Sequence, residues 1–236
     1  MPWWIALQFL SSLPVRLRRM PTPAETGQSL LWYPAVGLLF AALLSGLDAV
    51  LAGSPVLLHA AILLAVWVTL TGGLHLDGLA DTADAWVGGY GDRERTLAIM
   101  KDPRSGPMAV IALVLLLMLK FVALVAAIQA GHAQWWMVPV LGRAALLGMF
   151  LTTPYVRAGG LGEALANHLP RRAGWWVMAV CLLAGWLSLG SVLLAGIAVF
   201  TGLRWLLMRR LGGTTGDTAG AMLECLEVVL LVGLAL

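Results

Sequence analysis

Charged residues and cysteines are scarce in this chain of 236 residues. Only 11% of the residues are Asp, Glu, Lys or Arg, and 60% are hydrophobic; soluble domains are roughly 45–50% apolar. The mean hydropathy is +0.88. The two cysteines, Cys181 and Cys225, both lie in apolar runs, so the sequence implies neither a disulfide nor thiol chemistry. This composition excludes a soluble globular domain and indicates an integral membrane protein.

Apolar runs long enough to cross about 30 Å of hydrocarbon predict about seven transmembrane helices. Four lie near residues 29–52, 56–72, 106–130 and 133–153. The stretch 174–208 is too long for one span and divides at Leu189–Ser191 into two, and a last span covers 219–236. Before them, residues 3–13 form a short N-terminal interfacial helix, because their aromatic side chains suit the headgroup level. We therefore expect an all-α fold, a polytopic membrane helix bundle that occupies residues 1–236 as a single domain.

Basic residues fall at alternate ends of these predicted helices. Thirteen of the fifteen Lys and Arg residues lie in the four segments 16–19, 93–104, 157–172 and 204–210. The intervening turns at 52–55, 129–134 and 189–191 contain none. By the positive-inside rule the basic segments are cytoplasmic. We therefore expect a multi-pass protein of the bacterial cytoplasmic (inner) membrane, with any active site facing the cytoplasm.

Three aspartates, Asp77, Asp81 and Asp84, lie within eight residues of the polar segment 72–105, which we expect to be a cytoplasmic loop. If their stretch is helical, the second and third lie at about 40° and 340° from the first, which makes one acidic stripe. Like charges so placed repel each other, and carboxylates on one face suit a Mg²⁺ that also holds substrate phosphates. A solvated helix start capped by Asp77 explains only one of the three acids. His75 adjoins the stripe, either as a phosphate contact or as a structural residue.

Two further polar segments lie on the same predicted side of the membrane. In the first, Lys101 and Arg104 flank Asp102. A guanidinium that donates two parallel N–H groups, together with the compact charge of a lysine, suits phosphate oxygens. The same cations also suit a helix end without any ligand, so charge alone leaves both interpretations open. The second segment, 209–220, contains four glycines that allow a ligand to approach the backbone around Gly213 and Thr214.

The last predicted span contains two glutamates, Glu224 and Glu227. With Asp217 they occupy about 80° of one helix face. Intramembrane carboxylates cost roughly 2.5–3.5 kcal/mol each on insertion scales, so they face a partner or a polar cavity. We expect Arg143 to be the partner, and Lys120 is the other charged residue inside a span. The glutamates then either complete a metal position or form an ion pair that locks two helices together.

Three segments combine these features in a fixed order: Gly72–Asp84, Met100–Gly106, and Gly212–Ala221 followed by the two glutamates. Together they closely resemble the cobalamin-5'-phosphate synthases, also called adenosylcobinamide-GDP ribazoletransferases. The resemblance covers nearly the whole chain. Trp86 replaces an expected glycine, and Pro103 with Ser105–Pro107 departs from the usual pattern, but the charged residues are in place.

The resemblance implies a Mg²⁺-dependent transferase that completes the nucleotide loop of cobalamin. The hydroxyl of α-ribazole, or of its 5'-phosphate, attacks the cobinamide-side phosphorus of adenosylcobinamide-GDP; GMP leaves and adenosylcobalamin or its 5'-phosphate forms. Such a transfer requires positioning, charge neutralisation and orientation or deprotonation of the hydroxyl. The expected metal ligands are Asp77, Asp81, Asp84, Glu224 and Glu227. The expected catalytic residues are Lys101, Arg104 and, as the base, Asp102 or Asp217. The expected substrate-binding residues are His75, Arg143, Gly213 and Thr214.

Two other classes of protein share parts of the pattern. A CDP-alcohol phosphotransferase also places aspartates on membrane helices, but Leu79–Asp81 replaces the residues that its motif needs after Asp77–Gly78. A cation- or proton-coupled transporter would use the charges inside the spans, but the chain has no internal repeat of the kind common in transporters. We therefore expect one catalytic domain whose partners are the two small-molecule substrates and the lipid bilayer. No nucleic acid is expected, and a homo-oligomer is compatible with the sequence.

Overall fold

The chain folds into helices whose lengths follow its apolar runs. The structure is a computed structural model that describes residues 1–236, except for the side chain of Leu161. Its α-helices are α1 (Pro2–Leu10), α2 (Pro23–Ser29), α3 (Tyr33–Val50), α4 (Val56–Thr71), α5 (Leu74–Gly88), α6 (Arg93–Ile99), α7 (Pro107–Ala130), α8 (Met137–Thr152), α9 (Leu161–His168), α10 (Arg171–Leu189), α11 (Val192–Leu211) and α12 (Gly216–Ala235). Two 3₁₀ helices, η1 (Leu30–Trp32) and η2 (Ala133–Trp136), precede α3 and α8. The predicted all-α fold is confirmed.

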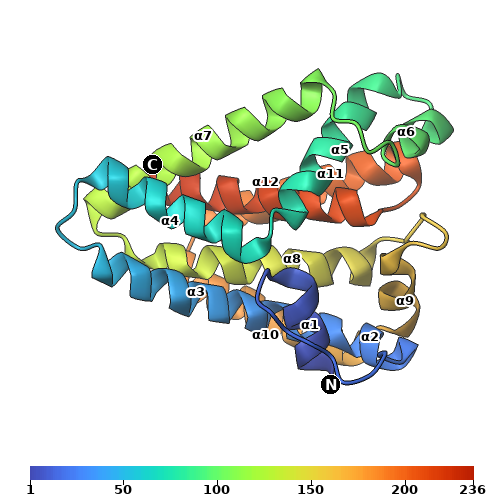
Figure 1. Cartoon of the computed structure of the whole chain (residues 1–236), viewed down its shortest axis with the longest axis horizontal. Helices are drawn as coiled ribbons and strands as arrows, with labels where there is room; N and C mark the ends of the chain where they lie inside the picture. The colour runs from blue at the N-terminus through green and yellow to red at the C-terminus, as the bar shows by residue number, and fades with distance from the viewer.

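Six helical segments are long and apolar enough to cross a membrane. They contain α3, α7, α8, α10, α11 and α12, and the pair α4 and α5 adds a seventh if it counts as one broken span. The six segments and α4 run roughly along the long axis of the molecule, whereas α5 turns away from it (Figure 1). The prediction of a bundle with about seven spans is thus confirmed, as six spans or as seven with the bent pair.

Two glycines separate α4 from α5. Gly72 and Gly73 have φ values of +63° and +70°, a left-handed conformation that glycine adopts without steric cost. The chain bends there by 86°. The segment 72–105, expected to be a loop, therefore contains the 15-residue helix α5 and the short helix α6. Figure 1 shows α5 leading to the end of the bundle where α6 and α9 lie.

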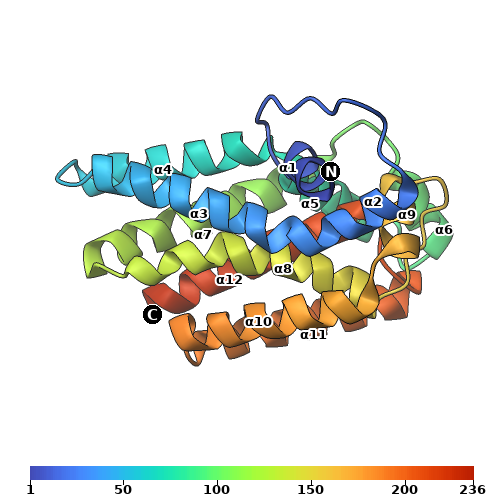
Figure 2. The same cartoon turned by 90° about the horizontal axis from the view of Figure 1, so that it is seen from below.

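Helix α8 forms the centre of the bundle. Every residue from Met137 to Leu151 is buried, and the helix packs against α3, α10 and α12. Figure 2 shows α8 between α3 and the pair α10 and α11. Its C-terminal carbonyl groups accept hydrogen bonds from two arginines, from Arg171 to Leu151 and from Arg204 to Thr152. These basic residues therefore stabilise a helix end, in addition to any role in topology.

The polar segments lie at one end of the bundle. Arg93 Nε donates to the Leu211 carbonyl oxygen at 2.7 Å. The Arg210 guanidinium stacks on the Trp86 ring at 4.3 Å. These contacts place the segment 72–105 beside the end of α11, as the alternating charge pattern predicts. Helix α1 packs against α2 and α3, and its position at a membrane interface stays a prediction.

Candidate active site

Two glycines let α5 and α12 cross closely near the polar end. A Cβ atom added at Gly78 would lie 2.8 Å from the Asp217 carbonyl oxygen. One added at Gly220 would lie 3.2 Å from the Cα atom of His75. The crossing therefore requires glycine at Gly78, and it brings Asp77 of α5 and Asp217 of α12 to the same cavity.

We expect Gly78→Ala to lower the activity by roughly a hundredfold, because the new methyl group pushes the α12 backbone away and displaces Asp217. Gly46→Ala is the matched control, since a Cβ atom there meets nothing within 4 Å. Turnover of the two variants in lipid, at equal amounts of inserted protein, checks the prediction. Equal turnover would show that the closeness of this crossing is not required.

The cavity at this crossing has a volume of about 330 Å³. Its polar lining includes His75, Asp77, Arg157 and Asp217. The rest of its wall is largely apolar, and α1, α3, α8 and α9 contribute to it together with α5, α12 and the segment after α8. Two stacked aromatic pairs contribute to it, Phe9 with Tyr33 at 6.3 Å and Phe150 with Tyr155 at 6.0 Å between ring centroids. An apolar pocket with a few convergent polar groups is the usual form of a small-molecule site.

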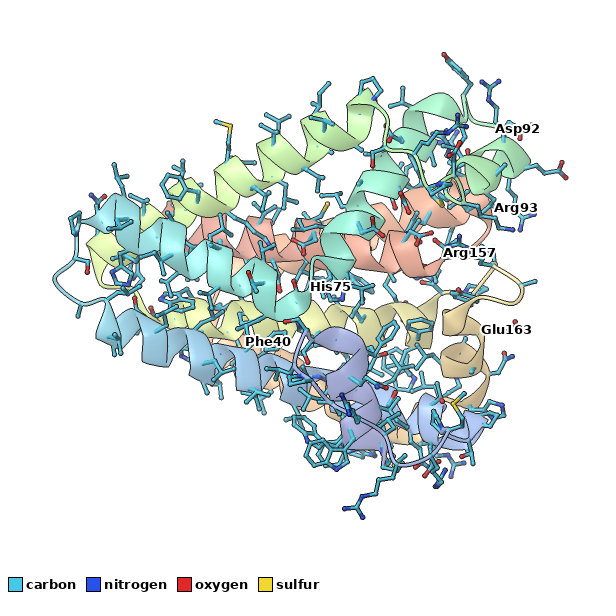
Figure 3. All side chains as sticks on the ribbon, in the orientation of Figure 1. Phe40, His75, Asp92, Arg93, Arg157 and Glu163 are labelled. Carbon is cyan, nitrogen blue, oxygen red and sulfur yellow. The ribbon has the colours of Figure 1, made fainter. Side chains whose placement is uncertain are left out.

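Arg157 and Asp217 form an ion pair at this cavity, with 2.7 Å between Nη1 and Oδ2. The pair is positioned by a backbone contact between the segment after α8 and the segment before α12. Thr214 N donates to the Pro154 carbonyl oxygen at 2.8 Å, and Val156 N donates to the Thr214 carbonyl oxygen at 2.9 Å. Figure 3 shows His75 in the interior of the bundle and Arg157 nearer its polar end.

This backbone contact changes the interpretation of Gly213 and Thr214. Both residues are buried, and a Cβ atom at Gly213 would lie 2.3 Å from the Pro154 carbonyl oxygen. Thr214 Oγ1 lies 2.8 Å from Thr218 Oγ1. The backbone and hydroxyl groups of Thr214 already have partners within the protein, so the substrate-binding role of Gly213 and Thr214 stays a prediction that this geometry does not favour. The glycine allows close packing of two chain segments instead of close approach of a ligand.

The three aspartates of α5 have different surroundings. Asp77 is exposed at the cavity, whereas Asp81 and Asp84 are half-buried. The Asp84 carboxylate accepts hydrogen bonds from the backbone N–H groups of Gly106 and, at 3.0 Å, Ala109. It therefore caps the N-terminus of α7 and has fewer free lone pairs for a metal ion. The stripe thus contains a structural cap, provided by its third aspartate rather than by its first.

Asp102 and Arg104 form a bidentate pair outside the cavity lining. Arg104 Nε donates to Oδ1 at 2.9 Å and Nη2 donates to Oδ2 at 2.7 Å. The guanidinium lowers the pKa of the Asp102 carboxyl to about 2. A general base works best with a pKa near the working pH, so this pairing disfavours Asp102 as the base. Lys101 and Arg104 are exposed on the same segment, which Asp84 anchors at Gly106.

Glu224 and Glu227 form a buried ion cluster with Lys120 and Arg143. Lys120 Nζ lies 2.5 Å from Glu224 Oε2 and 2.7 Å from Glu227 Oε2, and Arg143 Nη1 binds Glu227 Oε1. The expected pairing with Arg143 is confirmed, but Lys120 shares it. Arg143 is fully buried and packs over the Phe40 ring, so contact with a substrate is not supported.

Two carboxylates and two cations balance in this cluster, which joins α7, α8 and α12. The geometry therefore favours the structural ion pair over metal ligation by Glu224 and Glu227. It also weakens the transporter interpretation, because the glutamates already have protein partners.

The remaining carboxylates fit a hard cation. Asp81 lies close enough to Asp77 and Asp217 to interact with both electrostatically. Within the described part of the chain, no three histidine, cysteine or carboxylate side chains already form a metal-binding group. Mg²⁺ usually takes one or two carboxylates, several waters and substrate phosphate oxygens, and so needs no complete protein cage. The donor set therefore suits a Mg²⁺ that binds together with a phosphate group.

Arg157 and Tyr155 are cavity residues that sequence patterns did not indicate. Arg157 belongs to a basic segment, and such a segment indicates only topology by its charge. Its place beside Asp217 depends on the contact between residues 154–156 and 213–215, which no local pattern reveals.

A multi-pass bundle with a cavity lined by carboxylates and an arginine at its polar end has the organisation of a membrane-embedded enzyme. The chain belongs to the cobalamin-5-phosphate synthase family, which it matches over residues 2–235. It is therefore a transferase of cobalamin biosynthesis, as the resemblance of the three segments implies.

Similar proteins carry the name of that activity. An adenosylcobinamide-GDP ribazoletransferase of Pseudomonas fluorescens, strain Pf0-1, is 64% identical over 241 residues, which cover 100% of this chain and 99% of the relative. One of Pseudomonas putida, strain F1, is 64% identical over 242 residues, with the same coverage of both chains. No solved structure matches this chain.

Proposed function

We propose that this protein catalyses the Mg²⁺-dependent transfer of α-ribazole, or of its 5'-phosphate, to adenosylcobinamide-GDP. The products are GMP and adenosylcobalamin or its 5'-phosphate. The observation that supports the proposal best is the convergence of Asp77, Asp217 and Arg157 at one cavity, with Asp81 near enough to both aspartates to interact electrostatically. These groups supply the hard oxygen ligands, a base and a phosphate-binding cation, which are the parts that phosphoryl transfer needs.

Asp77 and Asp81 are the residues that would hold Mg²⁺, because they are the aspartates of α5 without a capping role. When bound there, the ion would neutralise charge on the diphosphate. Asp217 is the proposed base and accepts the proton of the attacking hydroxyl. A bond forms between the ribazole oxygen and the cobinamide-side phosphorus. The bond from that phosphorus to the bridging oxygen breaks, and GMP leaves with the electron pair. The role proposed for Lys101 and Arg104, on the exposed segment after α6, is to bind GMP as it leaves the cavity.

Release of GMP tests the proposed function directly. In lipid nanodiscs, the purified protein should release GMP from adenosylcobinamide-GDP only when α-ribazole and Mg²⁺ are both present. Chelation by EDTA should stop the release, and added Mg²⁺ should restore it. Release without α-ribazole would indicate hydrolysis, and release without a divalent cation would remove the metal from the mechanism.

We also propose that the polar end of the bundle faces the cytoplasm of the bacterial inner membrane. In a variant with Cys181 and Cys225 replaced by alanine, a single cysteine at Glu94 or at Arg209 should react with a membrane-impermeant reagent only from the cytoplasmic side. Both positions are exposed at the polar end. A cysteine at Gln134, which is exposed in η2, should react only from the opposite side. Labelling of Glu94 and Gln134 positions from one side would contradict the arrangement of the spans.

A further inference from the structure

Arg157 is the cation of the cavity. Among the described residues that line it, no other Lys or Arg is present, whereas Asp77 and Asp217 supply two negative charges. A diphosphate that enters such a lining meets net repulsion unless a cation compensates for it. Lys101 and Arg104 lie on an exposed segment outside the lining, and Arg143 is buried in the ion cluster. Arg157 is therefore the arginine best placed to meet an anionic group there.

The ion pair of Arg157 leaves most of its guanidinium free. Only Nη1 bonds to Asp217, and Nε and Nη2 have no hydrogen-bond partner among the described residues. The side chain is 26% exposed. Arginine binds phosphate most strongly with two parallel N–H groups. By comparison, Arg104 already donates two parallel N–H groups, from Nε and Nη2, to the Asp102 carboxylate.

The surroundings of Arg157 favour an exchange of partners. Its backbone segment is fixed by the contact of Val156 with Thr214, so the guanidinium starts from a defined position. Gly216, at the N-terminus of α12, also lines the cavity, and a Cβ atom there would meet nothing within 4 Å. Open space at a helix N-terminus, beside an arginine whose Nε and Nη2 groups the described chain leaves unpaired, suits a phosphate group.

We propose that Arg157 is a substrate-binding residue that exchanges Asp217 for the diphosphate oxygens of adenosylcobinamide-GDP. The exchange frees Asp217 for the attacking hydroxyl. This inference rests on the proposed function and identifies which cation of the chain binds the diphosphate substrate.

Binding measurements separate this role from a structural one. With α-ribazole omitted, we expect Arg157→Gln to weaken the binding of adenosylcobinamide-GDP to the protein in Mg²⁺-containing nanodiscs by roughly 10- to 100-fold. Binding of α-ribazole alone, which carries no phosphate, should change less than about twofold. Arg157→Lys should fall in between, because lysine keeps the charge but has no fork. Arg95→Gln is the matched control, since Arg95 is exposed at the same end and contacts the Tyr90 ring.

Unchanged binding of adenosylcobinamide-GDP to Arg157→Gln would overturn the inference. Equal weakening for both ligands, with a lower midpoint of thermal unfolding, would also overturn it, because Arg157 would then only hold the fold together. If the wild-type protein bound neither ligand, the proposed function itself would be wrong. If the wild-type protein bound both ligands and Arg157→Gln bound them equally well, only the inference about Arg157 would be wrong.

A second measurement tests the exchange itself, with inorganic pyrophosphate as the probe in EDTA. Asp217→Asn should bind pyrophosphate more tightly than Asp77→Asn does. Both variants remove one negative charge from the cavity, but only Asp217→Asn releases Arg157. The higher affinity of Asp217→Asn for pyrophosphate, compared with Asp77→Asn, should disappear in the double variant Asp217→Asn with Arg157→Gln. Equal binding by the two single variants would show that Asp217 and the anion do not compete for Arg157.

Discussion

Asp77→Asn and Asp81→Asn should each lower the rate of GMP release by roughly a hundredfold or more. Each change removes a negative metal ligand at nearly constant volume, and even changes in the groups that support a ligand cost about 10- to 100-fold. Neither residue supports the bundle, so the amount of inserted protein and the midpoint of thermal unfolding should stay close to wild type. Turnover measured across a range of Mg²⁺ concentrations checks the prediction.

Two control variants make this result specific. Glu94→Gln removes an exposed carboxylate from the same polar end and should leave turnover unchanged. Asp84→Ala should instead lower the stability by about 0.5–2 kcal/mol, because Asp84 caps α7 and alanine has no acceptor oxygen. If Asp77→Asn and Asp81→Asn kept wild-type turnover at limiting Mg²⁺, the acidic stripe would be structural. The site assigned here would then be incorrect.

The fold could be predicted well because its main determinants are local. The length of an apolar run fixes whether a helix can span hydrocarbon, and Leu189–Ser191 marks a turn between two such runs. The bend between α4 and α5 was harder to predict. In the sequence, Gly72 and Gly73 are equally compatible with the start of a polar loop. Only their left-handed backbone conformation shows that the chain bends there and continues as the helix α5.

The candidate site could be predicted only in part. The aspartates stand out because they are neighbours in the sequence, and their helical spacing places them on one face. Which residue pairs with each charged side chain depends on the packing of distant segments, and the spacing of residues along the sequence does not reveal that packing. Asp84 bonds to a backbone more than twenty residues later, and Arg157 meets Asp217 from sixty residues away. The sequence therefore indicated which residues carry charge, but not which of them neutralise one another.

Glu227→Gln should be among the most destabilising single changes in the protein. Glu227 is fully buried and pairs with both Arg143 and Lys120. Breaking a buried ion pair by removing one partner typically costs about 3–5 kcal/mol, because the other charge is left uncompensated. We expect a large fall in the midpoint of thermal unfolding in lipid, with activity lost in proportion to the folded fraction. Glu94→Gln again serves as the exposed control.

The double variant Glu227→Leu with Arg143→Met distinguishes an ion pair from a metal site. It removes one charge of each sign and leaves Lys120 paired with Glu224 at 2.5 Å, so most of the lost stability should return. A metal ligand would behave differently. Replacement of Glu227 would then abolish turnover at unchanged stability, the double variant would stay inactive, and Mg²⁺ would raise the unfolding midpoint of the wild type more than that of Glu227→Gln. Recovery of folded, active protein in the double variant would place the chemistry at the cavity between α5 and α12, because a catalytic carboxylate cannot be replaced by leucine.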